Sequence, residues 1–271
     1  MITLNAGAAR VELYPDAGGR LGQITVDARR LLRGPGDGEL AWSAWGCYPM
    51  LPWVNRIRGG VATFEGETIT VPVNYPDGTA IHGLAADTPW GVVDAGDTAA
   101  ELAVELDVDR YHVRATQRFA LAETALTQEI EVVNLASWRV PAGIGIHPWF
   151  VAAPVTVPAE LIWEGDGPMP SGPPRPVRGA EDLRQAALPP GLDRCWTGLT
   201  GTAATIGDLT LSWSGPITQV VVYTGVEGFV CVEPQTMASD GIRLHEEGVE
   251  GTGVVALEPG ATLAVGYRFA W

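Results

Sequence analysis

Two segments of the sequence each place one ionisable side chain at the end of an apolar run, directly before a proline. Residues 143–150 carry His147, and residues 229–236 carry Glu233. An imidazole titrates near neutral pH, and a carboxylate that is partly removed from water becomes a better base. Facing one another across a pocket, these groups would form a proton donor and a proton acceptor. The alternative is structural: Glu233 pairs with an arginine, and His147 bonds a backbone carbonyl.

Three other segments supply groups suited to binding a polyol. Asn55 and Arg56 lie between apolar neighbours, and the planar fork of an arginine can bridge adjacent hydroxyl groups. His82 precedes Gly83, a residue that lets backbone or ligand approach closely. Asp193 follows a turn and adds a second carboxylate. The alternatives are a solvated surface arginine and an aspartate that only caps its turn.

Two tryptophans, Trp149 and Trp196, neighbour these polar candidates. A flat apolar ring excludes water and suits the face of a sugar, so we expect both to contribute to substrate binding. The sequence contains no metal-type ligand spacing and no nucleotide-binding motif. It therefore predicts a site with neither a metal nor a cofactor.

Composition disfavours several classes of function. The net charge of −15 argues against nucleic acid and anionic membrane surfaces as partners. All 17 basic residues are arginine, which excludes Schiff-base chemistry, lysine-linked pyridoxal phosphate and a P-loop. Three widely spaced cysteines, no secretory signal pattern and no apolar stretch of bilayer length predict a reduced, cytoplasmic protein. A monomer and a homodimer both fit the sequence.

The elements that must position these residues have the pattern of β-strands. Apolar and polar residues alternate between turns rich in glycine and proline, most clearly over 113–121, 126–132 and 263–271. One short helix is expected over 181–188, where acidic residues precede it and prolines follow. We predict an all-β sandwich or barrel with very little helix, in one domain spanning 1–271. Further strands are expected at 9–13, 21–26, 60–64, 68–73, 102–106, 209–213, 217–223 and 229–232.

The order of several short motifs resembles that of the aldose 1-epimerase (galactose mutarotase) family. The resemblance covers most of the chain, because the matching segments run in order from residue 55 to residue 236. These segments are Asn55-Arg56-Ile57, Phe64-Glu65-Gly66, Asn74, Ile81-His82-Gly83, Trp90, residues 145–150, residues 192–197 and residues 232–236.

The resemblance implies a large antiparallel β-sandwich of the galactose mutarotase type, with its pocket on a concave sheet face. It implies that Glu233 takes the proton of the anomeric hydroxyl while His147 protonates the ring oxygen. His82, Arg56 and Asp193 would hold the sugar hydroxyls, with His82 also near the reacting centre. The ring would open, rotate about C1–C2 and close on its other face, with no cofactor.

Two departures place the chain in a broader epimerase-like branch of the family. Residues 81–87 lack a glycine that usually follows the first motif residues in well-studied galactose mutarotases, and the chain is shorter than those enzymes. The expected substrate is a free aldohexose such as glucose or galactose.

Other hypotheses remain open. A related branch acts on hexose 6-phosphates, whose phosphate requires cations; residues 82–90 include no arginine, although Arg56 with Arg58 could supply such a site. A non-catalytic carbohydrate-binding protein would keep the pocket without turnover. A glycosidase would use Glu233 and Asp193 as its two carboxylates.

Overall fold

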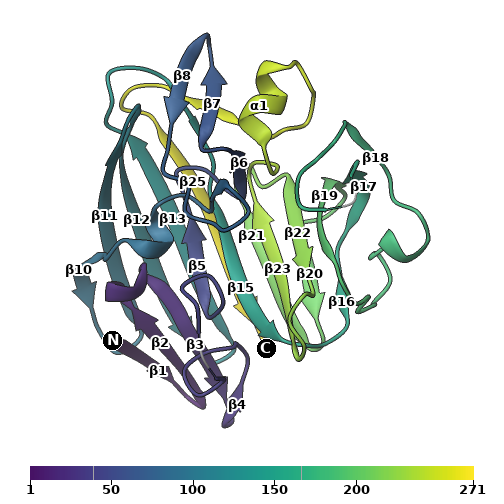
Figure 1. Ribbon diagram of the computed structural model, residues 1–271. Helices are drawn as coiled ribbons and strands as arrows, with labels where there is room; N and C mark the ends of the chain where they lie inside the picture. Colours follow the sequence, from purple (N-terminus) through teal and green to yellow (C-terminus); the bar gives the residue numbers. More distant parts are fainter. Residues whose placement is uncertain (39, 166) are drawn as a thin grey trace.

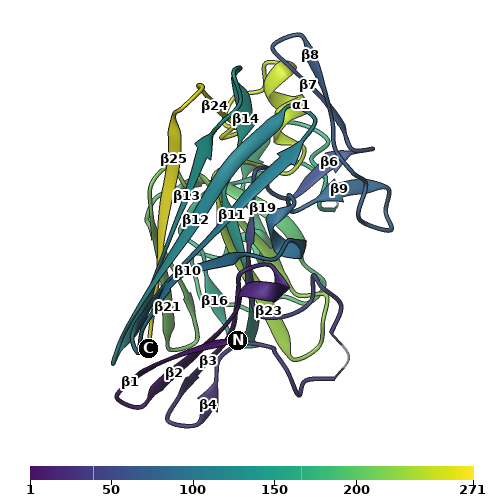
Figure 2. The ribbon, with the colours of Figure 1, turned by 90° about the vertical axis from the view of Figure 1, so that its left-hand side faces the viewer.

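Two large sheets packed face to face make up most of the computed structural model, which describes residues 1–38, 40–165 and 167–271 (Figure 1, Figure 2). The larger sheet has eleven strands, and the pairs in both sheets are antiparallel. In spatial order its strands are β1 (Ile2–Ala6), β2 (Ala9–Tyr14), β3 (Arg20–Val26) with β4 (Arg29–Arg30) beside it, β5 (Cys47–Met50), β15 (Gly145–Val151), β23 (Phe229–Gln235), β22 (Gln219–Tyr223), β19 (Asp193–Leu199), β17 (Ala159–Trp163) and β18 (Pro174–Pro176).

The second sheet has eight strands and includes the C-terminal strand of the chain. In spatial order its strands are β10 (Gly91–Ala95), β11 (Ala99–Val108), β12 (Tyr111–Ala122), β13 (Ala125–Asn134), β25 (Thr262–Ala270), β21 (Leu209–Ser214), β20 (Ala203–Ile206) and β16 (Val155–Thr156). The buried residues of β12 include 113, 115, 117, 119 and 121, as their alternation predicts. The all-β sandwich expected from the sequence is confirmed.

The main core lies between the two sheets. Phe150 of β15 packs against Phe269 of β25 with ring centroids 6.2 Å apart, so this side of β15 faces the interior. Because side chains alternate along a strand, His147 and Trp149 project from the opposite, outer face of the larger sheet.

Small elements cover that outer face. Figure 2 shows β6 (Arg56–Arg58) and β9 (Thr79–Ile81), which pair with one another, on the side away from β12 and β13. Two more short ladders lie at the top of the view in Figure 2, where β7 (Val61–Phe64) pairs with β8 (Glu67–Thr70) and β14 (Val140–Ala142) pairs with β24 (Val255–Leu257).

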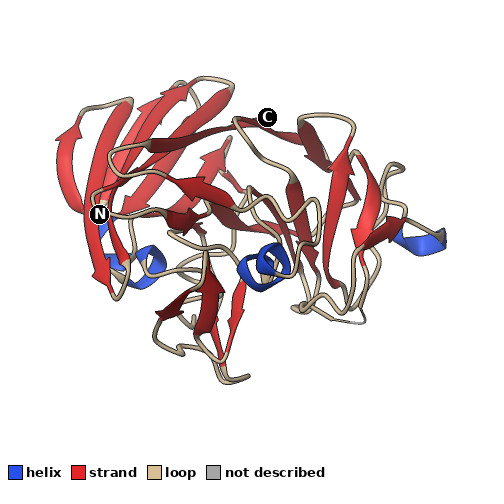
Figure 3. Ribbon diagram, turned by 90° about the horizontal axis from the view of Figure 1, so that it is seen from above, coloured by secondary structure: helices blue, strands red, loops and turns tan. Residues whose placement is uncertain are grey.

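Helical structure is sparse in the described part of the chain (Figure 3). It comprises the 3₁₀ turns η1 (Pro15–Ala17), η2 (Ala85–Asp87) and η3 (Gly179–Glu181), and the α-helix α1 (Gly241–Glu246), which packs against β7. None of the helices in these residues is both long enough and apolar enough to cross a membrane.

The helix predicted over 181–188 is wrong. After η3 the chain runs alongside β16, where Ala187 and Val155 exchange backbone hydrogen bonds of 2.7 and 3.0 Å. The N–H of Val157 donates to the carbonyl of Leu183 at 2.7 Å. So short a helix is marginal by itself, and these long-range bonds engage the backbone groups that it would need.

The expectation that the apolar runs end at His147 and Glu233 is also wrong. β15 continues through Pro148, and β23 continues through Pro234. Both side chains therefore lie within strands of the sheet, where flanking residues hold the backbone on either side. Proline lacks the N–H that a ladder requires, but it keeps an extended backbone.

The ladder between β15 and β23 is interrupted around the two prolines. It pairs Gly145 with Gln235 and resumes at Trp149, with no paired residues between. Carried across this gap, the same register places His147 opposite Glu233.

Candidate active site

A cavity of about 290 Å³ opens on the outer face of the larger sheet. Segment 41–44 and residues at the ends of β6 and β9 form its walls. Of the residues predicted to form a site, all except Trp196 line this cavity. Its floor comes from β5, β15, β23, β22 and β19, through Tyr48, His147, Trp149, Glu233, Val221, Tyr223 and Asp193.

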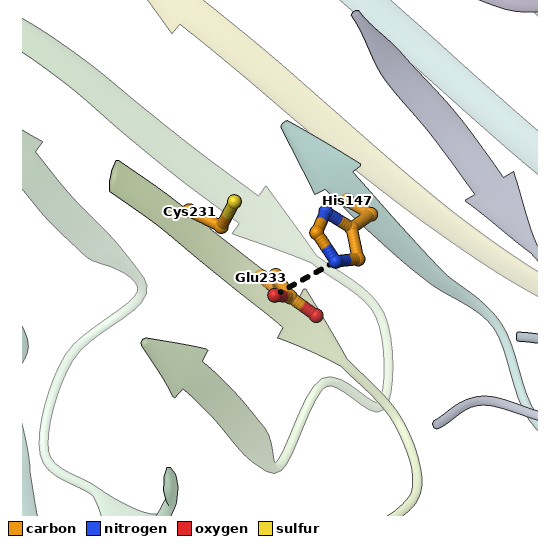
Figure 4. A group of neighbouring side chains, drawn as sticks. All are labelled: His147, Cys231 and Glu233. Atoms are coloured by element: carbon orange, nitrogen blue, oxygen red, sulfur yellow. Dashed lines mark ion pairs between the residues drawn. The ribbon is translucent and has the colours of Figure 1, made fainter. Parts of the chain in front are cut away.

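His147 and Glu233 face one another from neighbouring strands at the bottom of the cavity (Figure 4). Nε2 of His147 lies 3.2 Å from Oε1 of Glu233, and both residues are buried. The other carboxylate oxygen, Oε2, has no hydrogen-bond partner in the described residues, and neither has Nδ1 of His147. Buried polar atoms are ordinarily paired, so these atoms are suited to a polar ligand.

Burial shifts the protonation of this pair toward neutral groups. Loss of solvation raises the pKa of Glu233 well above its usual range, and the nearby Asp193 carboxylate adds to the rise. Burial lowers the pKa of His147 to about 3, and the positive charge of Arg56 adds to the fall. A carboxylic acid beside a neutral imidazole is therefore favoured. Transfer of one proton across the 3.2 Å contact would convert that state into an ion pair.

His82 approaches His147 edge-on, with ring centroids 5.0 Å apart and an interplanar angle of 83°. Its backbone is left-handed, with φ +61°, and its N–H donates to the carbonyl of Asn55, itself at φ +52°, at 2.8 Å. Such backbone is uncommon outside glycine and costs energy, so the fold holds this ring in place at some strain. Burial, with His147 and Arg56 nearby, lowers the pKa of His82 well below its usual range.

The guanidinium of Arg56 is buried and held from several sides. Its Nε donates to Oδ2 of Asp77 at 2.9 Å, and its Nη1 donates to Oδ1 of Asn55 at 3.3 Å. The ring of Tyr75 lies against it, with Cζ 5.6 Å from the ring centroid. A guanidinium has five N–H donors, so others are left for a ligand in the cavity.

Asp193 opens β19 opposite Tyr223 of β22. Burial raises the pKa of its carboxyl, and Arg56 acts in the opposite direction. The cavity thus carries an acidic group on the side of Glu233 away from His147, where hydroxyl groups of a ligand could donate to it.

The two tryptophans have different surroundings. Trp149 lines the cavity, but its ring is stacked on His147 with centroids 5.5 Å apart. Trp196 is fully buried in the core, and its indole N–H donates to the carbonyl of Glu181 at 2.9 Å. The expectation that Trp196 offers a face to the sugar is therefore not met, because its strand directs the ring inward.

The sequence matches the aldose 1-epimerase family model over residues 1–263. The chain belongs to this family. Among curated relatives, YphB of Escherichia coli K12 is 30% identical over 155 residues, which are 57% of this chain and 53% of YphB. YihR of the same organism is 30% identical over 105 residues, 37% of this chain and 34% of YihR. The chain thus spans about half or less of the length of these relatives, and both are described as uncharacterized.

Solved structures of aldose 1-epimerase type share the fold. A candidate aldose 1-epimerase from E. coli K12 superposes with a TM-score of 0.88 at 23% identity, covering 99% of this chain and 97% of that one. A galactose mutarotase-like protein from Clostridium acetobutylicum gives 0.84 at 18% identity, covering 98% and 93%. The galactose 1-epimerase from Lactobacillus acidophilus gives 0.77 at 17% identity, covering 99% and 92%. At these identities the likeness is one of fold.

Sequence reasoning missed four residues that shape this aldose 1-epimerase-family site. Tyr48, Tyr75 and Tyr223 line the cavity, and Asp77 holds Arg56. Asp77 precedes Gly78, a pair that signals a turn but not its long-range partner. The tyrosines carry no local signal, because their place in the cavity depends on pairing between distant strands.

A group of three possible metal ligands lies within the same site. Donor atoms of His147, Glu233 and Cys231 fall within 4.8 Å of one another (Figure 4). Ligation by cysteine requires the thiolate. Burial and the charge of Glu233 raise the pKa of the Cys231 thiol well above its usual range, so a cation at this site would have to displace the thiol proton.

Proposed function

We propose that this chain is an aldose 1-epimerase that interconverts the α and β anomers of a free aldohexose such as glucose or galactose. The observation that carries the proposal is the buried contact of 3.2 Å between His147 and Glu233. One can accept and the other donate a proton at neighbouring atoms of a sugar ring. Membership of the aldose 1-epimerase family supports the same reaction.

In the proposed mechanism the Glu233 carboxylate accepts the proton of the anomeric hydroxyl. His147, as imidazolium, gives its proton to the ring oxygen, and the C1–O5 bond breaks to leave an open-chain aldehyde. Glu233 is then protonated and His147 neutral, the state that burial favours. After rotation about C1–C2, Glu233 returns its proton to the aldehyde oxygen and His147 accepts the hydroxyl proton, so the cycle restores both groups.

The remaining predicted site residues would bind and orient the sugar. Arg56, fixed by Asp77, and His82 would donate to hydroxyl groups, whereas Asp193 would accept from them. Asn55 would act partly through Arg56, whose Nη1 donates to its amide oxygen. We also propose that residues 1–271 act as one domain, since each large sheet combines strands from both halves of the chain.

The charges around the cavity support an unphosphorylated substrate. Among the described residues that line the cavity, Arg56 is the only arginine. Asp77 already neutralises its charge, at a distance of 2.9 Å. Arg58, the second cation considered for a phosphate, lies outside this lining with its side chain 61% exposed, 3.6 Å from Asp240. A phosphate dianion would meet Asp193 and Glu233 without a compensating cluster of cations.

Polarimetry of freshly dissolved α-glucose and α-galactose, with their 6-phosphates in parallel, tests the proposal. Wild-type protein should accelerate the change in rotation of a free sugar. Glu233→Gln and His147→Asn should each lower kcat by on the order of 10²–10⁴-fold. The matched control is His112→Asn, because His112 lies on β12 outside the cavity. This variant should keep wild-type activity.

The same sugars, with calorimetry added, separate two of the other hypotheses. Sugar binding by calorimetry without acceleration of mutarotation would identify a carbohydrate-binding protein. Faster anomer exchange only with the 6-phosphates would identify a hexose-phosphate enzyme. Wild-type rates in both Glu233→Gln and His147→Asn would refute the mechanism.

A further inference from the structure

The imidazole of His147 is stacked against two aromatic rings. Tyr48, its cross-strand neighbour on β5, stacks on it with ring centroids 4.8 Å apart and an interplanar angle of 23°. Trp149, two residues along β15, stacks with centroids 5.5 Å apart and an angle of 19°. Two near-parallel rings packed against the imidazole restrict its tilting.

Both aromatic residues are tied to a single acceptor. The hydroxyl of Tyr48 donates to the carbonyl oxygen of Ser43 at 3.1 Å, and the indole N–H of Trp149 donates to the same oxygen at 3.0 Å. Ser43 belongs to segment 41–44, which forms a wall of the cavity. Neither ring can turn away from His147 without breaking its hydrogen bond.

Charged side chains lie against the same two rings. The guanidinium carbon of Arg20 is 5.2 Å from the ring centroid of Tyr48, and that of Arg33 is 5.5 Å from the centroid of Trp149. Arg20 is buried and is fixed by hydrogen bonds to three backbone carbonyls, of Ala17, Trp45 and Ala86. These cation–π contacts further stabilise the observed positions of the two aromatic rings.

Among the described residues, no hydrogen bond to Nδ1 orients the ring of His147. In many enzymes a hydrogen bond to one ring nitrogen fixes which way the other nitrogen points. Nδ1 of His147 has no such partner within the described chain. Apart from the contact of Nε2 with Glu233 and the edge-on ring of His82, the orientation of the imidazole therefore depends on the stacked rings of Tyr48 and Trp149.

We propose that Tyr48 and Trp149, tied to the carbonyl oxygen of Ser43, are positioning residues that hold the His147 imidazole with Nε2 directed at Glu233. The inference deepens the proposed function and rests on it wherever turnover is the readout. Tyr48 acts through His147, since its hydroxyl is engaged by Ser43.

The first test separates the hydrogen bond from the ring. Tyr48→Phe keeps the stacked ring and removes the tie to Ser43, and it should lower kcat about five- to tenfold with KM nearly unchanged. Tyr111→Phe is the matched control, because Tyr111, on β12 of the eight-stranded sheet, is also buried and donates to a backbone carbonyl, that of Pro141, at 2.8 Å. The control should keep wild-type kcat.

The second variant tests the shared acceptor. Trp149→Phe keeps an aromatic face beside His147 and loses the donor to Ser43. Because both bonds converge on one carbonyl, the double variant Tyr48→Phe/Trp149→Phe should lower kcat by a factor different from the product of the two single losses. Strictly multiplicative losses would show that the two rings act separately and would overturn the shared tie.

A readout that does not need turnover keeps the inference distinguishable from the proposed function. NMR of protein labelled with ¹⁵N-histidine, with His147 assigned through His147→Asn, should give one sharp set of ring signals in wild type and in Tyr111→Phe. Tyr48→Phe should broaden or double the His147 set. Unchanged His147 signals in Tyr48→Phe would overturn the inference, whether or not the wild-type protein mutarotates a sugar, because the ring would then be held without the tie.

Discussion

The carboxylate of Asp77 holds the guanidinium of Arg56, with Oδ2 2.9 Å from Nε, although Asp77 lies outside the cavity lining. Asp77 is itself fixed, because its Oδ1 accepts hydrogen bonds from the N–H of Thr79 at 3.0 Å and from its hydroxyl at 2.6 Å. These bonds lower the pKa of Asp77 despite partial burial. A turn outside the cavity lining thus sets where the guanidinium of Arg56 points.

Asp77→Asn should therefore weaken sugar binding more than chemistry. Loss of the charge-assisted bond frees Arg56 to adopt other rotamers, and we expect KM to rise by about tenfold with a smaller change in kcat. Asp208→Asn is the matched control, since Asp208 pairs with Arg29 at 2.9 Å on the surface with its side chain 72% exposed. An unchanged KM in Asp77→Asn would contradict the role given to Arg56.

His82 allows backbone strain and chemistry to be separated. Asparagine tolerates the left-handed backbone at φ +61°, whereas alanine does not tolerate it well. Both His82→Asn and His82→Ala should lose activity, but only the alanine variant should also lose about 1 kcal/mol of unfolding free energy. Urea denaturation of both variants measures this difference, and equal stabilities would show that the position is not strained.

The buried site should also shape the dependence of stability on pH. Unfolded His82 and His147 bind protons below about pH 6.5 while the native residues stay neutral, so their burial makes stability fall as pH falls. Glu233 acts in the opposite sense, because it is protonated in the native state and ionised in the unfolded state above pH 4.5. Between pH 4.5 and 6.5 the effect of Glu233 on the unfolding free energy therefore cancels that of about one of the two histidines.

Glu233→Gln removes that offset. The unfolding free energy should then decline more steeply between pH 6.5 and 5, by up to about 1.4 kcal/mol per pH unit beyond wild type. Glu129→Gln, at an exposed position on β13, should leave the slope unchanged. The unfolding free energy is measured by chemical denaturation at each pH. If it changed with pH equally in wild type and Glu233→Gln, the native His147–Glu233 pair would not retain a proton on Glu233.

Trp196→Phe tests the reassignment of Trp196 to the core. A smaller ring leaves space in a fully buried site and removes the donor to Glu181, so stability should fall by about 2 kcal/mol. At a temperature where the variant stays folded, KM and kcat should equal those of wild type. A raised KM would place Trp196 in contact with the sugar after all.

Much of the fold could be predicted because strands leave a local signature. The alternation in β12 follows from one face packing against the core, and the pattern shows it without any knowledge of the partner strand. The failed helix over 181–188 shows the limit. Local residues favoured a helix there, but the backbone hydrogen bonds that Ala187 exchanges with Val155, and the one that the Leu183 carbonyl accepts from Val157, decided otherwise.

The sequence by itself determined that this is an all-β chain of the aldose 1-epimerase family, with His147 and Glu233 as an expected pair. Only the tertiary structure decided that these residues face one another within adjacent strands, that Tyr48 and Trp149 stack on His147, and that Trp196 turns away. The reason is physical: alternation and turn chemistry act over a few residues, whereas the register between distant strands depends on how the whole core packs.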